Sequence, residues 1–222
     1  MSEREYHERE FAEHANRAYL GPLLSPLELH DGATFADLGC GSGYVNAFCT
    51  SQYHLRHNVG LEFNFDTLRL AREKNVTTAC VHWICGSAEA IPLPAASVDA
   101  LVCRVVIPLV GVNQVIAEIG RILKPGGNAL LGLHDWKFYM RWISMNPRAW
   151  KNSIAALLHL SLGGWFNLTG HQFRPRYRGH VIGQTFQSNF RMKRLLRTHG
   201  MSIKSVIAEP EYRLYAQRVS AD

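Results

Sequence analysis

Over the first 135 residues, short apolar runs alternate with longer stretches in which apolar residues recur every three or four positions. The short runs have the length of buried strands, and the longer stretches have the periodicity of helices. The expected strands are 34–38, 57–61, 81–85, 98–103 and 128–133. The expected helices are 43–52, 66–75 and 111–123. Strands that alternate with helices predict a parallel sheet with helices on both faces.

The alternation stops at Trp136. Helical, aromatic-rich sequence follows, and then a segment rich in Gly, Arg and Pro at 169–183. A basic helix at 189–199 and a predicted β-hairpin at 201–219 come last. Because sheet-type sequence resumes in this hairpin, we interpret 136–183 as an insertion in one domain and not as a second domain.

A glycine-rich turn, GCGSG at 39–43, follows the first expected strand and opens the first expected helix. Glycines let the backbone approach a ligand, and the N-terminus of a helix directs unpaired N–H groups at it. The dinucleotide fingerprint requires a glycine where Tyr44 stands. Asp37 would repel a pyrophosphate and attract an amino group; its alternative role is to cap the helix. The turn therefore favours a cationic nucleoside amino acid over a dinucleotide.

A second acidic residue, Glu62, follows the second expected strand, 25 residues after Asp37. A carboxylate at this place in an α/β fold accepts hydrogen bonds from both ribose hydroxyls of a nucleoside. The alternative is an ordinary surface Glu.

Five motifs follow one another between residues 30 and 135: 36–43 (ADLGCGSG), 59–62 (VGLE), 86–92 (GSAEAIP), 98–101 (VDAL) and 118–127 (EIGRILKPGG). In this order they resemble the motifs of class I S-adenosylmethionine-dependent methyltransferases, in particular the small-molecule branch that includes the ubiquinone and menaquinone C-methyltransferases. The resemblance implies an α/β, Rossmann-like fold, with a seven-stranded sheet, an antiparallel last strand and a helical insertion after strand 5.

The resemblance also implies that residues 1–222 form a single methyltransferase domain with S-adenosyl-L-methionine as its cofactor. The expected parts are an N-terminal helical cover (1–30), a cofactor-binding core (31–135), a substrate-side insertion or lid (136–183), and a closing helix with a β-hairpin (184–222).

Several residues acquire roles in cofactor binding from the resemblance. Asp37 and the backbone of Gly39 and Gly41 would face the methionine moiety, and the backbone of Cys103 would lie near its amino-acid end. Glu62 would hold the ribose.

At the adenine end, Phe63 would flank the ring, and Ser87 and Ala88 would lie at its edge. The family commonly has Asp where Ser87 stands, and a Ser hydroxyl is a weaker acceptor because it is uncharged. Glu89 is a second candidate for this contact.

The resemblance assigns no catalytic residue on the acceptor side. A methyl transfer needs a base only if the acceptor loses a proton. His134 and Asp135 stand at the end of the fifth expected strand, where such a base belongs, and Tyr139 is a further candidate. The alternative for His134 is a structural role.

Substrate contacts are expected from Trp136, Arg174, Arg176, Arg178 and His180. The three arginines alternate, so in an extended segment they would point to one side and hold an anionic group. A solvated basic face is the alternative for the arginines, and a lid that buries aromatic side chains is the alternative for the insertion.

Charge is unevenly distributed along the 222 residues, whose net charge is +6. Between Trp136 and Ala208 there are twelve Lys or Arg residues and no Asp or Glu. This stretch coincides with the expected substrate side, so the charge favours an acceptor with negative or electron-rich character.

Cysteine spacing and the N-terminus bear on the cellular compartment. The five cysteines show no paired spacing, which indicates free thiols and no zinc site, and the charged N-terminus lacks the apolar core of a secretory signal. The sequence therefore predicts a cytoplasmic protein without a bound metal. The most apolar stretch, 154–168, is too short to span a bilayer.

The leading hypothesis is methyl transfer by in-line displacement to a hydrophobic or partly anionic small-molecule acceptor. One alternative is an RNA or protein methyltransferase that uses the basic second half, although the chain lacks the tetrapeptide typical of amino-group nucleic-acid methyltransferases. Another is a non-catalytic, cofactor-binding scaffold. Weak contact with a membrane surface through the segment 154–165 is compatible with each of these, and the oligomeric state stays open.

Overall fold

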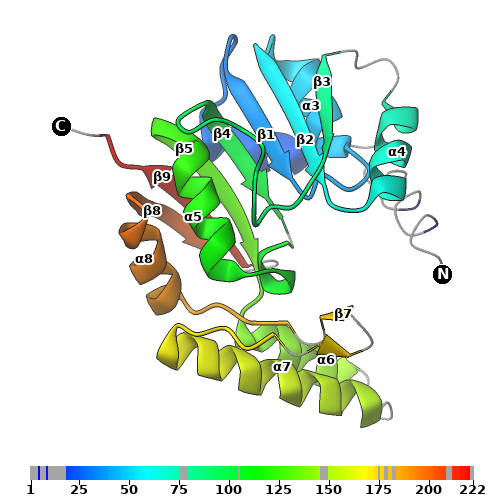
Figure 1. The fold of residues 1–222 in the computed structure, drawn as a ribbon, viewed down its shortest axis with the longest axis vertical. Helices are drawn as coiled ribbons and strands as arrows, with labels where there is room; N and C mark the ends of the chain where they lie inside the picture. The colour runs from blue at the N-terminus through cyan, green and yellow to red at the C-terminus, as the bar shows by residue number, and fades with distance from the viewer. Residues whose placement is uncertain are drawn as a thin grey trace.

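Seven strands form one sheet in the order β3-β2-β1-β4-β5-β9-β8 (Figure 1). The computed structural model describes residues 5, 9, 19–75, 80–104, 106–145, 150–174, 176–177, 180–181, 184–208 and 212–220. The strands are β1 Thr34–Leu38, β2 His57–Glu62, β3 Val81–Cys85, β4 Val98–Cys103, β5 Leu123–Leu133, β8 Met201–Ile207 and β9 Tyr212–Arg218. Strands β1 to β5 pair in parallel, and β9 is antiparallel to both of its neighbours. The predicted seven-stranded sheet with an antiparallel last strand is confirmed.

Helices flank this sheet and extend beyond its lower end (Figure 1). Their bounds are α2 Leu20–Leu24, α3 Tyr44–Gln52, α4 Phe65–Lys74, α5 Val112–Ile122, α6 Trp136–Met145, α7 Trp150–Thr169 and α8 Asn189–Thr198, with 3-10 turns η2 Ser25–Leu27 and η3 Ile107–Leu109. Two short strands, β6 Arg176–Tyr177 and β7 His180–Val181, pair with each other. The sequence did not predict this two-stranded ribbon.

The alternation of side chains along β1 explains the two layers of helices. Phe35 belongs to a buried cluster with residues of α2 and α3 on one face of the sheet. Ala36 and Leu38 belong to a second cluster with residues of α5 and α8 on the other face. Successive strand residues point to opposite faces, so both faces are covered and a ligand has access at the ends of the strands.

Strand β5 begins at Leu123, five residues before the expected strand. Helix α5 ends at Ile122, and Leu123 already pairs with Val98 of β4. The register of that ladder shifts between Val98 and Ala100, and Gly126 has a φ of 80°. The glycines therefore make an irregularity within the strand, where the sequence predicted only a helix stop.

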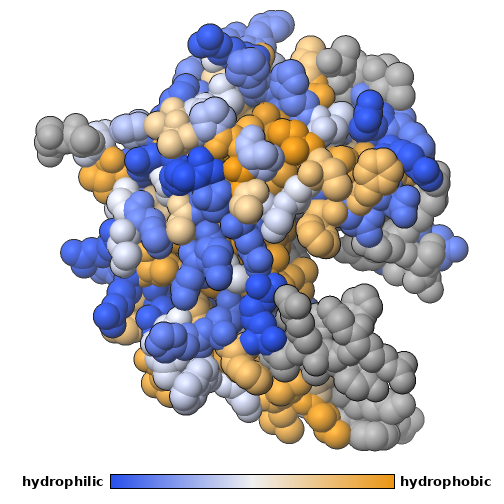
Figure 2. All heavy atoms as spheres, viewed as in Figure 1, coloured by the Kyte–Doolittle hydropathy of each residue, from blue (hydrophilic) through white to orange (hydrophobic). Residues whose placement is uncertain are grey.

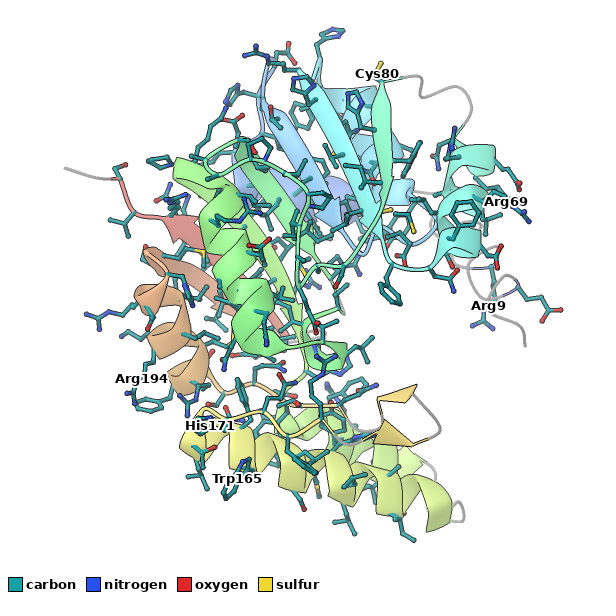
Figure 3. The ribbon with its side chains drawn as sticks, in the orientation of Figure 1. Arg9, Arg69, Cys80, Trp165, His171 and Arg194 are labelled. Atoms are coloured by element: carbon teal, nitrogen blue, oxygen red, sulfur yellow. The ribbon has the colours of Figure 1, made fainter. Side chains whose placement is uncertain are left out.

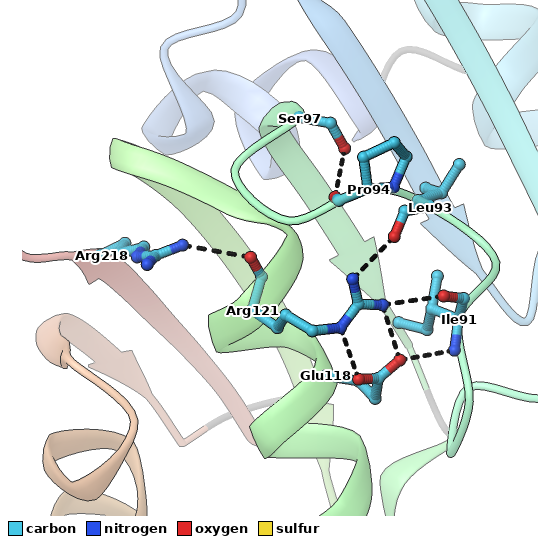
Figure 4. Close-up of polar contacts among 7 residues, drawn as sticks. All are labelled: Ile91, Leu93, Pro94, Ser97, Glu118, Arg121 and Arg218. Carbon is cyan, nitrogen blue, oxygen red and sulfur yellow. Dashed lines mark hydrogen bonds and ion pairs between the residues drawn. The ribbon is translucent and has the colours of Figure 1, made fainter.

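The extended segment 91–94 is held against α5 by one ion pair (Figure 4). Arg121 donates to the carbonyl oxygens of Ile91 and Leu93, at 2.8 and 2.7 Å. Glu118 pairs with Arg121 at 2.7 Å and accepts from the Ile91 N–H at 2.7 Å. The pair fixes the path of the chain from the β3 loop to β4, and thereby the edge of the candidate site.

The insertion follows β5 directly and lies below the carboxyl ends of the parallel strands (Figure 1). It consists of α6, α7 and the small ribbon, and α6 packs against α7. A helical insertion after strand 5 is thus confirmed. Within the part of the chain that the structure describes, no helix combines the length and the apolar content needed to cross a bilayer.

Candidate cofactor and acceptor site

The glycine-rich turn connects the carboxyl end of β1 to the N-terminus of α3. Gly39, Gly41 and Gly43 have φ angles of 75°, 53° and 77°, in the left-handed region that other residues rarely adopt. A Cβ atom on Gly39 would collide with the side chain of Val106, and one on Gly43 would collide with the ring of Trp83. The turn is therefore tight, with neighbouring side chains packed on it, and only glycine satisfies both conditions.

Two carboxylates adjoin this turn. Asp37 lies within β1 and is only 3% exposed. Glu62, at the end of β2, accepts from the Gly41 N–H through Oε2 at 3.1 Å and from the Asn64 N–H through Oε1 at 2.9 Å. These two hydrogen bonds fix the carboxylate beside the turn and leave further lone pairs for a ligand. Burial, together with the charges of Asp37 and Glu62, raises the pKa of the Cys40 thiol well above its ordinary value, so Cys40 stays neutral.

The residues around the turn fit S-adenosylmethionine. The Ser42 hydroxyl is buried and has no hydrogen-bond partner among the described residues. Phe63, which follows Glu62, is 78% exposed and offers an apolar ring beside the carboxylate. Two carboxylates, backbone N–H groups and an exposed aromatic ring suit a ligand that combines an ammonium group, a ribose and a base.

The adenine-edge residues form a turn after β3. Ser87 Oγ accepts from the Glu89 N–H at 3.1 Å, and Ala88 is buried. The Glu89 carboxylate is occupied elsewhere: Oε1 accepts from the Gly111 N–H at 2.5 Å and from Arg174 at 2.6 Å. Glu89 thus joins the cofactor loop to the insertion, which leaves Ser87 as the candidate for the adenine contact.

The end of β4 contributes Cys103 and Arg104. Cys103 is fully buried, and burial, with the charge of Asp37, raises the pKa of its thiol far above the ordinary value. A protonated thiol is a poor nucleophile, so only the backbone of Cys103 suits the predicted role. Arg104 donates from Nη1 to the Tyr44 hydroxyl at 2.8 Å and thereby places a cation beside the first turn of α3.

On the acceptor side, a hydrogen-bonded chain links β5, α6 and α7. Nδ1 of His134 lies 3.4 Å from the Tyr139 hydroxyl, which donates to Gln184 Oε1 at 3.1 Å. The Gln184 N–H donates to Nδ1 of His159 at 2.8 Å. The His134 ring stacks on Phe138, with 3.9 Å between ring centroids. The chain therefore runs from His134 through Tyr139 of α6 and Gln184 to His159 of α7, and α6 alone supplies the ring and the hydroxyl beside the His134 imidazole.

Burial sets the protonation of this chain. Tyr139 is fully buried, and burial raises the pKa of its hydroxyl far above the ordinary value. Burial lowers the pKa of His159. Tyr139 is therefore a neutral hydrogen-bond donor and His159 a neutral acceptor at neutral pH.

Asp135 caps α6, because its Oδ1 accepts from the Phe138 N–H at 2.9 Å. Its charge also acts on Tyr212, since burial and Asp135 together raise the pKa of Tyr212 to about 12. The capping contact uses Oδ1, so a catalytic role for Asp135 stays a prediction.

The predicted substrate residues do not form one cluster. Trp136 is exposed at the start of α6, and Arg174 makes the ion pair with Glu89. Arg176 and His180 stand in the paired strands β6 and β7, and Arg178 lies outside the described residues. Their alignment against an acceptor stays a prediction.

Sequence reasoning missed the residues that attach the insertion to the core. Gln172 accepts from the Val112 N–H at 2.8 Å and donates to the carbonyl oxygen of Val110 at 2.9 Å. Its amide also donates to Thr185 at 3.0 Å. Gln172 has no such signal in the sequence, whereas its partner Thr185 lies in a run of amides and hydroxyls, QTFQS at 184–188, in which Thr185 and Gln187 are buried.

A groove of about 670 Å³ lies between α8 and β8. Its lining includes Phe190, Lys193, Met201 and Val206. Strand β8 is the edge strand on the side of the sheet opposite to β3, so this groove is remote from the glycine-rich turn. It is not part of the candidate site.

Comparison with known proteins defines the class. Residues 36–131 match a family described as a methyltransferase domain. This match begins within β1, ends within β5, and includes every residue placed around the glycine-rich turn. Residues 36–131 therefore carry the methyltransferase domain that the motifs predicted, and this family and fold imply S-adenosyl-L-methionine as the cofactor.

Individual relatives carry more specific names. Trans-aconitate 2-methyltransferase of Azoarcus sp. (strain BH72) is 33% identical over 164 residues, which are 70% of this chain and 62% of that protein. The 2-phytyl-1,4-naphtoquinone methyltransferase of Thermosynechococcus vestitus is 30% identical over 107 residues, which are 47% of this chain and 48% of that protein. The chain spans less than half of the length of several curated relatives.

Among solved structures, the complex between the Haloferax volcanii Trm112 methyltransferase activator and a methyltransferase is similar to this chain. The TM-score is 0.66, with 17% identity, and the match covers 99% of this chain and 94% of that one. At this identity the likeness shows the fold.

Proposed function

We propose that this chain transfers a methyl group from S-adenosylmethionine to a hydrophobic or partly anionic small molecule bound between the carboxyl end of β5 and the insertion. The observation that carries the proposal is the hydrogen-bonded chain from His134 through Tyr139 to Gln184, at the end of the strand that follows the cofactor core. Bound S-adenosylmethionine supplies an electrophilic methyl group on a positively charged sulfur. The protein then has to bind, align and exclude water.

On the cofactor side, Asp37 faces the ammonium group and Glu62 holds the ribose hydroxyls, with Phe63 against the adenine. Gly39, Gly41, Ser87, Ala88 and the backbone of Cys103 complete the surface. Arg104 adds a residue to the predicted set, because its guanidinium beside Tyr44 suits the carboxylate of the methionine moiety. A buried carboxylate and a cation would thus match the two charges of one amino acid.

On the acceptor side, His134 takes the proton if the acceptor loses one. The Tyr139 hydroxyl has a single proton, which it donates to Gln184, so its oxygen accepts from a protonated Nδ1 of His134. The lone pair of the neutral ring is then on Nε2, which is the atom that removes the proton. Tyr139 and Gln184 act as positioning residues for this tautomer.

Two features support the acceptor class. Trans-aconitate, named in one relative, is a carboxylate, and a phytyl naphthoquinone, named in another, is lipophilic. The insertion offers both chemistries, since Trp136 is exposed and the stretch from Trp136 to Ala208 carries no acidic residue. A cytoplasmic location accords with free cysteines, three of them buried, and stays part of the proposal.

The test is incubation of the protein with radiolabelled S-adenosylmethionine and cell extract, followed by separation into lipid, small-molecule, RNA and protein pools. The proposal expects label in the lipid or small-molecule pool, which His134→Ala reduces. Label in RNA or protein would support the nucleic-acid or protein alternative. Tight cofactor binding without label in any pool would support a non-catalytic scaffold.

A further inference from the structure

Helix α7 is apolar on two sides. Its inner side packs into the molecule through Ala156, Leu162 and Phe166, which are buried. Its outer side carries a second apolar row, which we name the α7 stripe: Ile154, Leu157, Leu158, Trp165 and Leu168. These five side chains are between 39% and 85% exposed. A surface helix ordinarily presents polar residues on its outer side, so the α7 stripe calls for a specific explanation.

The spacing shows that the stripe is one continuous face. Its members stand at positions i, i+3, i+4, i+11 and i+14 of a single helix, with Ser161 at i+7. Trp165 points away from the sheet in Figure 3. In Figure 2, apolar side chains gather along the lower edge of the molecule, where Figure 1 places α7. The α7 stripe therefore faces outward, away from the sheet that carries the glycine-rich turn.

The surroundings of the stripe are cationic. The chain has no Asp or Glu between Trp136 and Ala208. Lys137 and Arg141 are exposed on α6, which packs against α7, and neither has an ion-pair partner among the described residues. An apolar row on a helix whose neighbouring helix carries exposed cations, in a stretch without carboxylates, has the chemistry of a helix that lies in the headgroup layer of an anionic bilayer.

We propose that α7 docks on the surface of an anionic membrane, with the α7 stripe inserted below the headgroups and Lys137 and Arg141 against the lipid phosphates. A second copy of the chain fits less well, because two acid-free surfaces would bring like charges together. Trp165 suits the interface, where its ring is in an apolar layer and its N–H reaches water. Helix α7 lies on the bilayer and does not cross it, in accord with the hydropathy of the described helices.

Docking would bring the insertion, with His134 and Trp136, to the surface in which a lipophilic acceptor dissolves. This consequence rests on the proposed function, whereas the docking itself does not. Cofactor binding is therefore measured separately on every variant by calorimetry. Loss of docking with intact cofactor affinity then concerns the membrane surface alone.

The experiment is flotation of the full chain with vesicles of phosphatidylcholine, with and without phosphatidylglycerol, at low and high salt. The double variant Leu157→Gln/Leu168→Gln removes two exposed apolar side chains and should weaken binding to anionic vesicles by about tenfold or more. Lys137→Gln/Arg141→Gln should weaken binding and reduce its dependence on salt. The control is Val219→Gln, at an apolar residue beyond β9 that is as exposed as Leu157, and this variant should bind as the wild type does.

Vesicles in which brominated lipids replace ordinary ones give a second readout, because bromine quenches nearby tryptophan fluorescence. Quenching should decrease in Trp165→Phe. The proposal is overturned if the wild type does not float with anionic vesicles, or if the Leu157→Gln/Leu168→Gln variant floats equally well. It is also overturned if sedimentation shows a wild-type dimer that this variant dissociates, since a second copy would then cover the stripe.

Discussion

Two regions of this protein are built in different ways: the region around the glycine-rich turn, residues 31–133, which we call the cofactor half, and the region from His134 to Ser188, which we call the acceptor half. In the cofactor half, Glu62 bonds to Gly41, 21 residues away, and Asn64 caps its own helix. In the acceptor half, Tyr139 bonds to Gln184, 45 residues away, and Arg174 bonds to Glu89, 85 residues away. Short motifs of glycines and acidic residues therefore determine the geometry of the cofactor half. The geometry of the acceptor half depends on contacts between distant segments, which no local motif records.

The largest effect is expected where the cofactor half depends on backbone shape. Gly39→Ala places a Cβ against Val106 in a residue whose φ is 75°, so we expect the protein to be destabilised by about 1–3 kcal/mol. Because the turn is displaced, cofactor affinity should also fall by about a hundredfold. Calorimetry and thermal unfolding measure both. Unchanged affinity would show that the turn does not contact the cofactor.

A glycine of the acceptor half provides the matched control. Gly164 lies in α7, and apart from its neighbours in the chain and the backbone of its own helix no atom lies within 4 Å of the position of its Cβ. Gly164→Ala should therefore stabilise the protein by about 0.5–1 kcal/mol through helix propensity and leave cofactor affinity as it is.

The second prediction concerns catalysis in the acceptor half. His134→Ala should lower kcat by roughly a hundredfold if His134 is the base, with cofactor affinity unchanged. Tyr139→Phe keeps the ring but removes the hydroxyl that fixes the tautomer, so the 15N chemical shifts of His134 should move toward a mixture of tautomers. A wild-type rate in His134→Ala, measured on the labelled pool, would retire the assignment.

The third prediction returns to the cofactor half. Glu62→Gln removes the negative charge but keeps the shape, so cofactor affinity should fall by about tenfold, since charge-assisted hydrogen bonds become neutral ones. The control is Glu73→Gln, an exposed residue of α4 that pairs with Arg69 at 3.6 Å. Equal affinities of the two variants by calorimetry would contradict the assignment of Glu62 to the ribose.

These contrasts explain what sequence alone predicts. Four of the five strands expected before Trp136 start at the predicted residue, because short runs of apolar and β-branched residues leave a clear pattern. The start of β5 was missed, since its glycines were interpreted as a helix stop and not as an irregularity in a strand. Asp37 and Glu62 were recognisable because they lie at the carboxyl ends of two strands, at the edge of the sheet where parallel strands bind ligands.

The acceptor half offered weaker signals. Gln184 and His159 are ordinary residues in sequence. Their role arises only when α7 and the segment 184–188 fold back on β5. Arg174 was predicted to meet the acceptor; the structure pairs it with Glu89 of the cofactor loop, and its contact with an acceptor stays a prediction. A charge pattern predicts that an arginine will pair with an anionic group. The tertiary fold determines which anionic group is within reach.

The fourth prediction tests whether the two halves are coupled. Glu89 and Arg174 form the ion pair between them, at 2.6 Å, with both side chains about 30% exposed. A double-mutant cycle with Glu89→Gln and Arg174→Gln should give a coupling free energy of about 1 kcal/mol in urea unfolding, because the pair is partly screened by solvent. A coupling near zero would mean that the hydrogen bonds of Gln172 hold the insertion without the ion pair.

The fifth prediction, with the smallest expected effect, concerns how stability depends on pH through one carboxylate of the cofactor half, Glu118. Hydrogen bonding to Arg121 lowers the pKa of Glu118 from its ordinary value of 4.5, and burial opposes this shift. A carboxyl whose pKa is lowered by folding stabilises the fold above its unfolded pKa, and this contribution is lost as the pH falls through the lower, folded pKa. The free energy of unfolding of the wild type should therefore exceed that of Glu118→Gln by about 1 kcal/mol at neutral pH, and the difference should decrease as the pH falls below 4.5 and through the folded pKa. Urea unfolding across this range measures it. The stretch from Trp136 to Ala208 has no carboxylate side chain, so this dependence on pH belongs to the core and not to the insertion. A difference that is independent of pH would assign the role of Glu118 to its shape and not to its charge.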